Sequence, residues 1–230
     1  MRLRPFLLAV TIALFPLASA RAEPENYTAG EVALTPPYCH DVLDPTYKIG
    51  GPKTEYWVSR MGRGFLAVHH YCWGLINTRR ALAPGVKPVI RTGLLQSVVG
   101  DYTFVIRNSP PDFILLPEIW TRIGETQLLR SQPGAAYDAF ARAREIKPDY
   151  WPAYSRWAAV LIRSGQKAEA KELVESGLQH APDSEELRQQ FRKLGGDPSR
   201  IRLPAKASDS ADATAENAAP AASASEGQTK

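Results

Sequence analysis

The sequence predicts an all-α fold, a short solenoid of stacked helical hairpins. A motif at 147–150 (KPDY) returns at 181–184 (APDS), so that Pro148 and Pro182 stand 34 residues apart. Self-similarity at a fixed period of this length is the signature of a repeat architecture. The composition, with 44% hydrophobic and 23% charged residues among 230, is that of a globular protein, and it excludes a collagen-like or mostly disordered chain.

The first repeat is predicted over 115–149, as two helices separated by a turn at 131–134 (SQPG) in which glycine supplies a left-handed cap. Pro148 ends the second helix, because proline disfavours helix at the residue before it. Gly124 and Ala136 are small enough to let the paired backbones approach closely. Large residues are expected to fill the space between the helices: Trp120, Ile123 and Phe140.

The second repeat is predicted over 150–183 with the same alternation of small and large residues. Ala158 and Ala170 occupy the small positions, the turn at 164–166 (SGQ) separates the helices, and Pro182 ends the second one. The large positions hold Trp157, Leu161 and Val174.

Two repeats leave apolar faces uncovered, because about three stacked units are needed for stability. On the C-terminal side, 184–203 is predicted to hold a capping helix that begins at the N-cap Ser184. On the N-terminal side, 61–114 is predicted to form a divergent helix pair, with helices at 65–81 and 94–107. The preceding residues, 23–60, are rich in proline and predicted to form an irregular arm.

The first repeat carries a known pattern of spacings. The pattern W-x2-L-G is matched by Trp120, Ile123 and Gly124, with Ile in place of Leu. The pattern A-x3-F is matched by Ala136 and Phe140, and the terminal proline is present. Gln127 stands where Tyr is usual. In these residues the chain resembles the tetratricopeptide repeat (TPR) family. The resemblance implies a non-enzymatic protein whose concave surface, lined by the first helix of each pair, holds a partner's peptide or helix.

Counting from the repeat frame gives a predicted partner-binding groove with an apolar strip flanked by arginines. Such a strip suits an amphipathic segment with acidic edges. Chaperone-tail-binding members of the family hold a C-terminal carboxylate with lysine and asparagine, which the two first helices here lack, and this argues against that mode. The predicted groove residues are Arg122, Glu125, Leu128, Arg156, Ala159, Ile162 and Arg163.

Both cysteines and three of the four histidines lie within 39–72: Cys39, His40, His69, His70 and Cys72. One hypothesis is a Cys39–Cys72 disulfide that staples the arm to the first helix, worth about 3–4 kcal/mol for a loop of this length. The alternative is a metal- or haem-handling periplasmic protein. One possible ligand set is His69 and Cys72, which are three apart on one helix face, together with Cys39 and His40. The other is His40, His69, His70 and Cys72.

The spacings favour the disulfide over the metal site. His69 and His70 are adjacent and point about 100° apart on a helix, and Cys39-His40 lacks the ligand spacing of structural zinc sites. The sequence contains no Cys-x-x-Cys, no phosphate loop, no G-x-S-x-G and no H-E-x-x-H. We therefore expect no enzymatic activity and no cofactor.

The two ends of the chain predict export and a disordered tail. Residues 1–22 have the basic start, the apolar run at 6–17 and the small residues of a signal peptide, cleaved after Ala20 or Ala22. The run is too short to span a membrane. Cleavage removes three arginines and no acidic residue, so the formal charge falls from +4 to +1. This gives no reason to expect nucleic acid as a partner.

Residues 204–230 lack large apolar side chains and are predicted to be disordered. The expected partner is another envelope or secreted protein.

Overall fold

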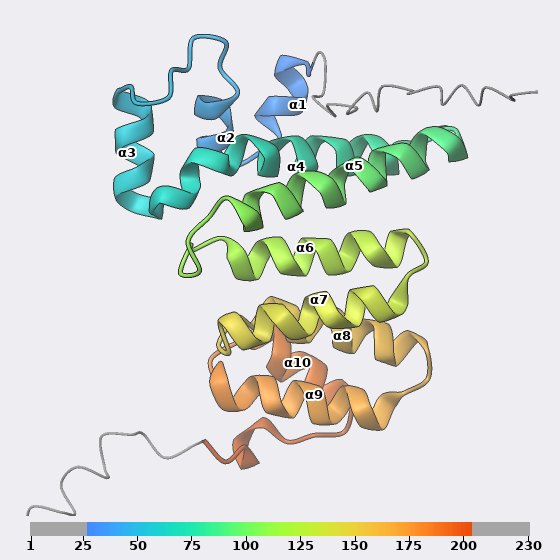
Figure 1. The fold of residues 1–230 in the computed structure, drawn as a ribbon. Helices are drawn as coiled ribbons and strands as arrows, with labels where there is room; N and C mark the ends of the chain where they lie inside the picture. The colour runs from blue at the N-terminus through green and yellow to red at the C-terminus, as the bar shows by residue number, and fades with distance from the viewer. Residues whose placement is uncertain (1–26, 204–230) are drawn as a thin grey trace, which may run out of the picture.

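The computed structural model describes residues 27–203, and all regular secondary structure within that range is helical (Figure 1). The predicted signal peptide at 1–22 and the predicted disordered tail at 204–230 lie outside the described residues. None of the helices in 27–203 has the length and apolar character needed to cross a bilayer.

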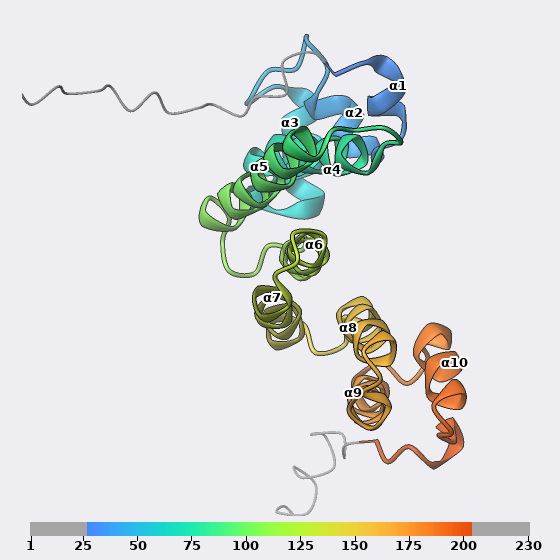
Figure 2. The same cartoon turned by 90° about the vertical axis from the view of Figure 1, so that its right-hand side faces the viewer.

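The fold is a TPR-type stack of antiparallel helix pairs. In each pair the two helices pack against one another. In Figure 2, α5 and α7 lie to the left of α4 and α6, while α9 lies below α8. The pairs are α4 (Val68–Leu82) with α5 (Pro88–Arg107), α6 (Leu116–Leu129) with α7 (Pro133–Ile146), and α8 (Trp151–Arg163) with α9 (Lys167–His180), followed by the cap α10 (Glu185–Lys193) and a 3-10 turn η2 (Pro198–Arg200).

The pairs are close because a glycine on one helix faces an aromatic ring on its neighbour. A Cβ atom at Gly124 would lie 2.8 Å from the ring of Phe140, and one at Gly74 would lie 2.3 Å from the ring of Tyr102. Phe140 and Tyr102 are almost fully buried. The predicted complementarity between small and large residues is therefore present in the first repeat, and it extends to the divergent pair α4–α5.

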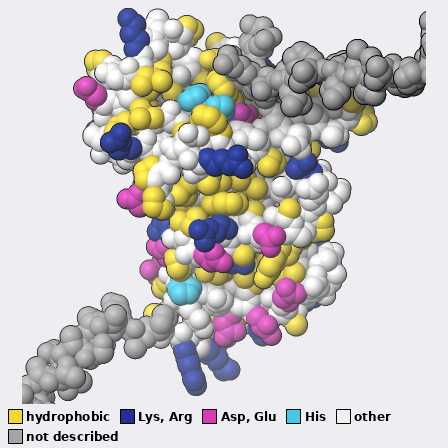
Figure 3. Space-filling model, in the orientation of Figure 1, with side chains coloured by type: hydrophobic (Ala, Val, Ile, Leu, Met, Phe, Trp, Pro, Cys, Tyr) yellow, Lys and Arg dark blue, Asp and Glu magenta, His cyan; other side chains and the backbone are white. Residues whose placement is uncertain are grey.

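Two local predictions need correction. The turn after α6 is capped by Ser131, with φ of 59°, while Gly134 is the second residue of α7; Pro133 begins that helix because its first turn needs no backbone donor. Trp120 is only partly buried, and it lines a furrow of about 450 Å³ between α5 and α7. Figure 3 shows this face of the second helices, where apolar side chains gather across the middle.

The N-terminal arm is not irregular as predicted. It forms α1 (Ala29–Ala33), α2 (Pro37–Val42), α3 (Pro52–Met61) and a 3-10 helix η1 (Arg63–Ala67), and α5 begins at Pro88 rather than at residue 94. Prolines begin α2, α3 and α5, since the first helical position tolerates a residue without an N–H. The helix α1 begins at a capping box, in which Thr28 and Glu31 satisfy one another's backbone donors.

Two hydrophobic cores meet at the α6–α7 pair. The first core joins α2, η1, α4 and α5 to one face of α6, and the second core joins α7 to α8, α9 and α10. Large buried members of the first core are Phe65, Tyr71, Ile76, Tyr102 and Ile119, and those of the second are Phe140, Val174, Leu178 and Leu187.

Candidate functional site

The concave face of the stack holds a cavity of about 410 Å³. Figure 2 shows α6 set back between α4 and α8 on this side, so that the first helices of three successive pairs form its walls. The lining residues are Thr78 and Leu82 of α4, Tyr102 of α5, Arg122, Glu125, Thr126, Leu128 and Leu129 of α6, Phe140 of α7, and Arg156, Ala159, Val160 and Arg163 of α8.

Six of the seven predicted groove residues line this cavity, and Ile162 does not. Ala159 and Arg163 are one turn apart and share a face of α8, whereas Ile162 is rotated by about 100° from Arg163. Its side chain is partly buried and packs on the second core. Ile162 therefore lies outside the cavity wall that Ala159 and Arg163 form.

The divergent pair also contributes to the groove, which was not predicted. Thr78 and Leu82 come from the last turns of α4, and Tyr102 reaches the cavity from α5 because Gly74 leaves room for its ring. Gly74 indicates this contribution in the sequence, because it occupies the small-residue position of a first helix. It therefore aligns α4 with α6 and α8 as the first helix of a pair.

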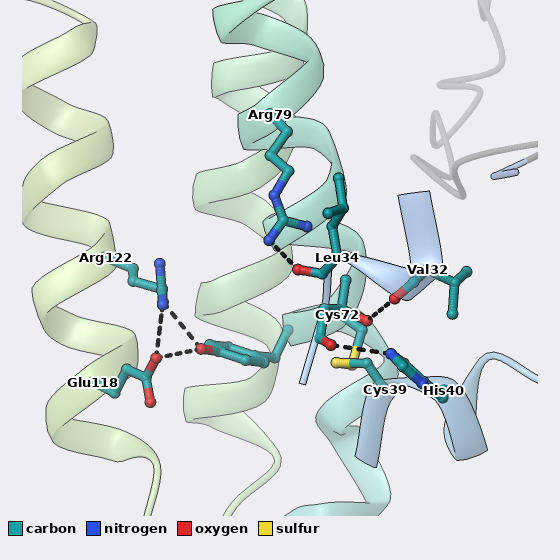
Figure 4. Close-up of a disulfide and its surroundings, with 10 residues drawn as sticks. Val32, Leu34, Cys39, His40, Cys72, Arg79, Glu118 and Arg122 are labelled. Atoms are coloured by element: carbon teal, nitrogen blue, oxygen red, sulfur yellow. Dashed lines mark hydrogen bonds and ion pairs between the residues drawn. A yellow bond between two sulfur atoms is a disulfide. The ribbon is translucent and has the colours of Figure 1, made fainter. Parts of the chain in front are cut away.

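Arg122 is held by groups of this chain. Its guanidinium donates to Glu118 at 2.8 Å and to the Tyr71 hydroxyl at 3.0 Å, and that hydroxyl donates to Glu118 at 2.6 Å (Figure 4). Burial of the guanidinium is the largest single effect and opposes its charge. The electrostatic effects of Tyr71, Glu118 and Tyr102 and the hydrogen bond to Glu118 together outweigh it, so the pKa of Arg122 is raised. The network links α4 to α6 and fixes Arg122 at the cavity wall.

The other two arginines of the groove differ from each other. Arg156 pairs with Glu125 at 3.1 Å across α6 and α8, with both side chains more than a third exposed, so the pair is worth little. Arg163 is exposed, and within residues 27–203 its side chain makes no ion pair or hydrogen bond. Of the three arginines predicted to receive acidic edges of a partner, Arg163 is therefore the one not already engaged.

The structure contains the Cys39–Cys72 disulfide, which joins α2 to α4 with a Cα–Cα distance of 5.6 Å (Figure 4). Both cysteines are fully buried, and in this state neither offers a thiolate to a metal. His40 Nε2 lies 3.0 Å from the Thr35 carbonyl oxygen, and His70 Nδ1 lies 2.8 Å from Asp101. The alternative ligand set is not brought together: in the described part of the chain, no three His, Cys, Asp or Glu residues are placed to hold a metal ion.

Residues 127–190 match the tetratricopeptide repeat family. The match begins in the last turn of α6 and runs through α7, α8 and α9 into α10, so it covers the region of the second core. No protein among curated sequences is significantly similar to the chain. A solved structure, the first TPR of Spaghetti (RPAP3) bound to the HSP90 peptide SRMEEVD, is 20% identical and covers 53% of this chain and 92% of its own, with a TM-score of 0.37.

Proposed function

We propose that the chain is an exported TPR scaffold or assembly adaptor that binds a segment of another envelope or secreted protein. The observation that carries the proposal is the concave cavity of about 410 Å³, walled by the first helices of three successive pairs. The family match over 127–190 supports a protein-interaction role, since TPR units typically present concave faces to partners.

The chemistry of the groove favours a mostly apolar segment with a single acidic side chain. Leu82 and Leu129 are 54% and 43% exposed and, with Ala159, offer apolar surface to a partner. The carboxylate of Glu118 already neutralises Arg122, and that of Glu125 stands beside Arg156, so a second carboxylate of a partner would approach a carboxylate of this chain. The acidic residue of the partner would pair with Arg163.

Site-specific photo-cross-linking tests the groove. A photoreactive amino acid at Ala159 should capture one discrete protein in cells, while the same residue at Ala168, exposed near the start of α9 and outside the cavity, should not. Adding Arg163→Glu should reduce the Ala159 adduct about tenfold, because it places like charges together at the contact. Equal adducts from both positions would contradict groove binding.

Export is tested on the mature chain. Intact-mass measurement of protein recovered from the periplasmic or secreted fraction should show loss of residues 1–20 or 1–22 and two fewer hydrogens for the Cys39–Cys72 disulfide. A full-length chain confined to the cytoplasm would overturn the envelope role.

A further inference from the structure

The end of the α4–α5 hairpin exposes large aliphatic side chains. Val89 and Ile90 are 77% and 51% exposed in the first turn of α5, and the loop before them, 83–87, is largely exposed as well. We call residues 82–93 the hairpin tip. Isolated exposed aliphatics are ordinary, but two adjacent ones beside an apolar loop form a patch that marks an interaction site.

The tip projects beyond the neighbouring pair. The helix α5 has 20 residues and α6 has 14, which corresponds to roughly 30 Å and 21 Å of helix. In Figure 1 the α4–α5 end extends past the ends of α6 and α7 on the same side. The apolar residues therefore stand at a convex apex rather than in a cleft.

The charged side chains in the sequence of the tip and its flanks are all basic. From 79 to 100 the sequence has four basic residues and no Asp or Glu: Arg79, Arg80, Lys87 and Arg91 are the four. Arg80 is paired with Glu31, and Arg91 donates to the Ala81 carbonyl oxygen at 3.0 Å, which holds its guanidinium beside the loop. Lys87 is exposed at the N-cap of α5, immediately before the aliphatic residues.

We propose that the hairpin tip docks on the surface of a bilayer that contains anionic lipid. A protruding apex with aliphatic side chains enters the boundary between headgroups and acyl chains, while lysine and arginine beside it meet the lipid phosphates. A protein partner would need a concave acidic pocket to match this shape, whereas a bilayer interface accommodates a convex tip of any outline. The tip lies on the membrane and does not cross it.

Docking at the tip would place the groove close to the membrane. Leu82 belongs to both surfaces, because it ends α4 at the tip and also lines the concave cavity. A partner segment emerging from the membrane would then meet the groove without diffusing away. The lipid contact itself uses Val89, Ile90 and Lys87, none of which lines the cavity.

Vesicle co-sedimentation of the full chain tests the proposal, with vesicles of phosphatidylcholine alone or mixed equally with phosphatidylglycerol. The apolar run at 6–17 is present in every variant, so the comparison is between variants. Val89→Ser with Ile90→Ser should lower binding to the anionic vesicles about tenfold, and Lys87→Glu should lower it several-fold. The matched control is Ile114→Ser, 61% exposed in the α5–α6 connection at the other end of α5, which should bind as the wild type does.

Two results would overturn the proposal. One is equal loss of vesicle binding in Ile114→Ser and in the Val89 and Ile90 variant, and the other is no dependence of the wild type on anionic lipid. Because Lys87, Val89 and Ile90 lie outside the cavity, these variants should keep the Ala159 cross-link in detergent. Loss of that cross-link without loss of vesicle binding would assign the tip to a protein partner and overturn the lipid role.

Discussion

The C-terminal repeats, α6 to α10, and the N-terminal part, α1 to α5, are held together by contacts of different range. In the repeats, a glycine meets an aromatic ring from the adjacent helix: Gly124 faces Phe140, and Gly177 faces Tyr154. These contacts join residues within one period of the sequence, so each unit largely specifies its own packing.

The N-terminal part relies on links between distant residues. The disulfide joins residues 33 apart, and Glu31 meets Arg80 across 49 residues, where the guanidinium lowers the pKa of Glu31 to about 2. Tyr71 bonds to Glu118 across 47 residues and ties this part to the repeats. The repeat pattern therefore specifies the second core locally, while the divergent pair needs covalent and polar links to hold its extra helices.

The largest expected effect lies in the repeats. Phe140→Ala should lower the free energy of unfolding by about 3–5 kcal/mol, because the ring is fully buried against Gly124 and the cavity cannot close. Tyr137→Ala on the same helix is the control, since its ring is 47% exposed and its loss should cost about 1 kcal/mol. Denaturant unfolding measures both. Equal costs would break the claim that the repeats depend on this contact.

The disulfide is the next largest effect and should act on the N-terminal part. Cys39→Ser with Cys72→Ser should lower the free energy of unfolding by about 3–4 kcal/mol, as expected for a closed loop of 33 residues. Hydrogen exchange should speed up in α1 to α4 and stay as in the wild type in α8 to α10. Uniform acceleration over both regions would show that the two cores are not separable.

The smallest effect is a dependence on pH in the N-terminal part. Burial in α4, and then the charge of His70, lowers the pKa of His69 to about 4. Between pH 6.5 and 4 the unfolded chain therefore binds more protons than the folded chain, and stability falls as the pH falls through this window. His69→Gln should remove that component, on the order of 2 kcal/mol.

Thermal unfolding from pH 8 to pH 4 measures the difference between wild type and variant. The two curves should run parallel above pH 7 and diverge below it. Parallel curves over the whole range would show that His69 is well solvated in the folded protein.

Much of the fold could be predicted from residues with fixed spacing, and the site could be predicted only in part. The helices of both repeats follow from the 34-residue offset between Pro148 and Pro182, and the cap follows from the N-cap Ser184. The proline-rich composition of 23–60 predicted an irregular arm, but Pro37 and Pro52 begin helices, and composition alone does not separate a proline at the first helical position from one that ends a helix.

The pairing of charges could not be predicted. Arg122 and Arg156 were expected to receive a partner's carboxylates, but α4 and α6 bring their own acidic and hydroxyl groups to them. Whether a surface arginine is engaged depends on side chains from other helices, which no local pattern specifies.

The sequence by itself determined the repeat period, the helix pairs of the repeats and the small residues that let those pairs approach, because these are local steric requirements that recur every 34 residues. Only the tertiary structure decided that Cys39 reaches Cys72, that α4 supplies the third wall of the groove, and that Arg163 is the groove arginine without a partner among residues 27–203. Those outcomes depend on where the chain brings distant segments together, and a spacing rule contains no information about that.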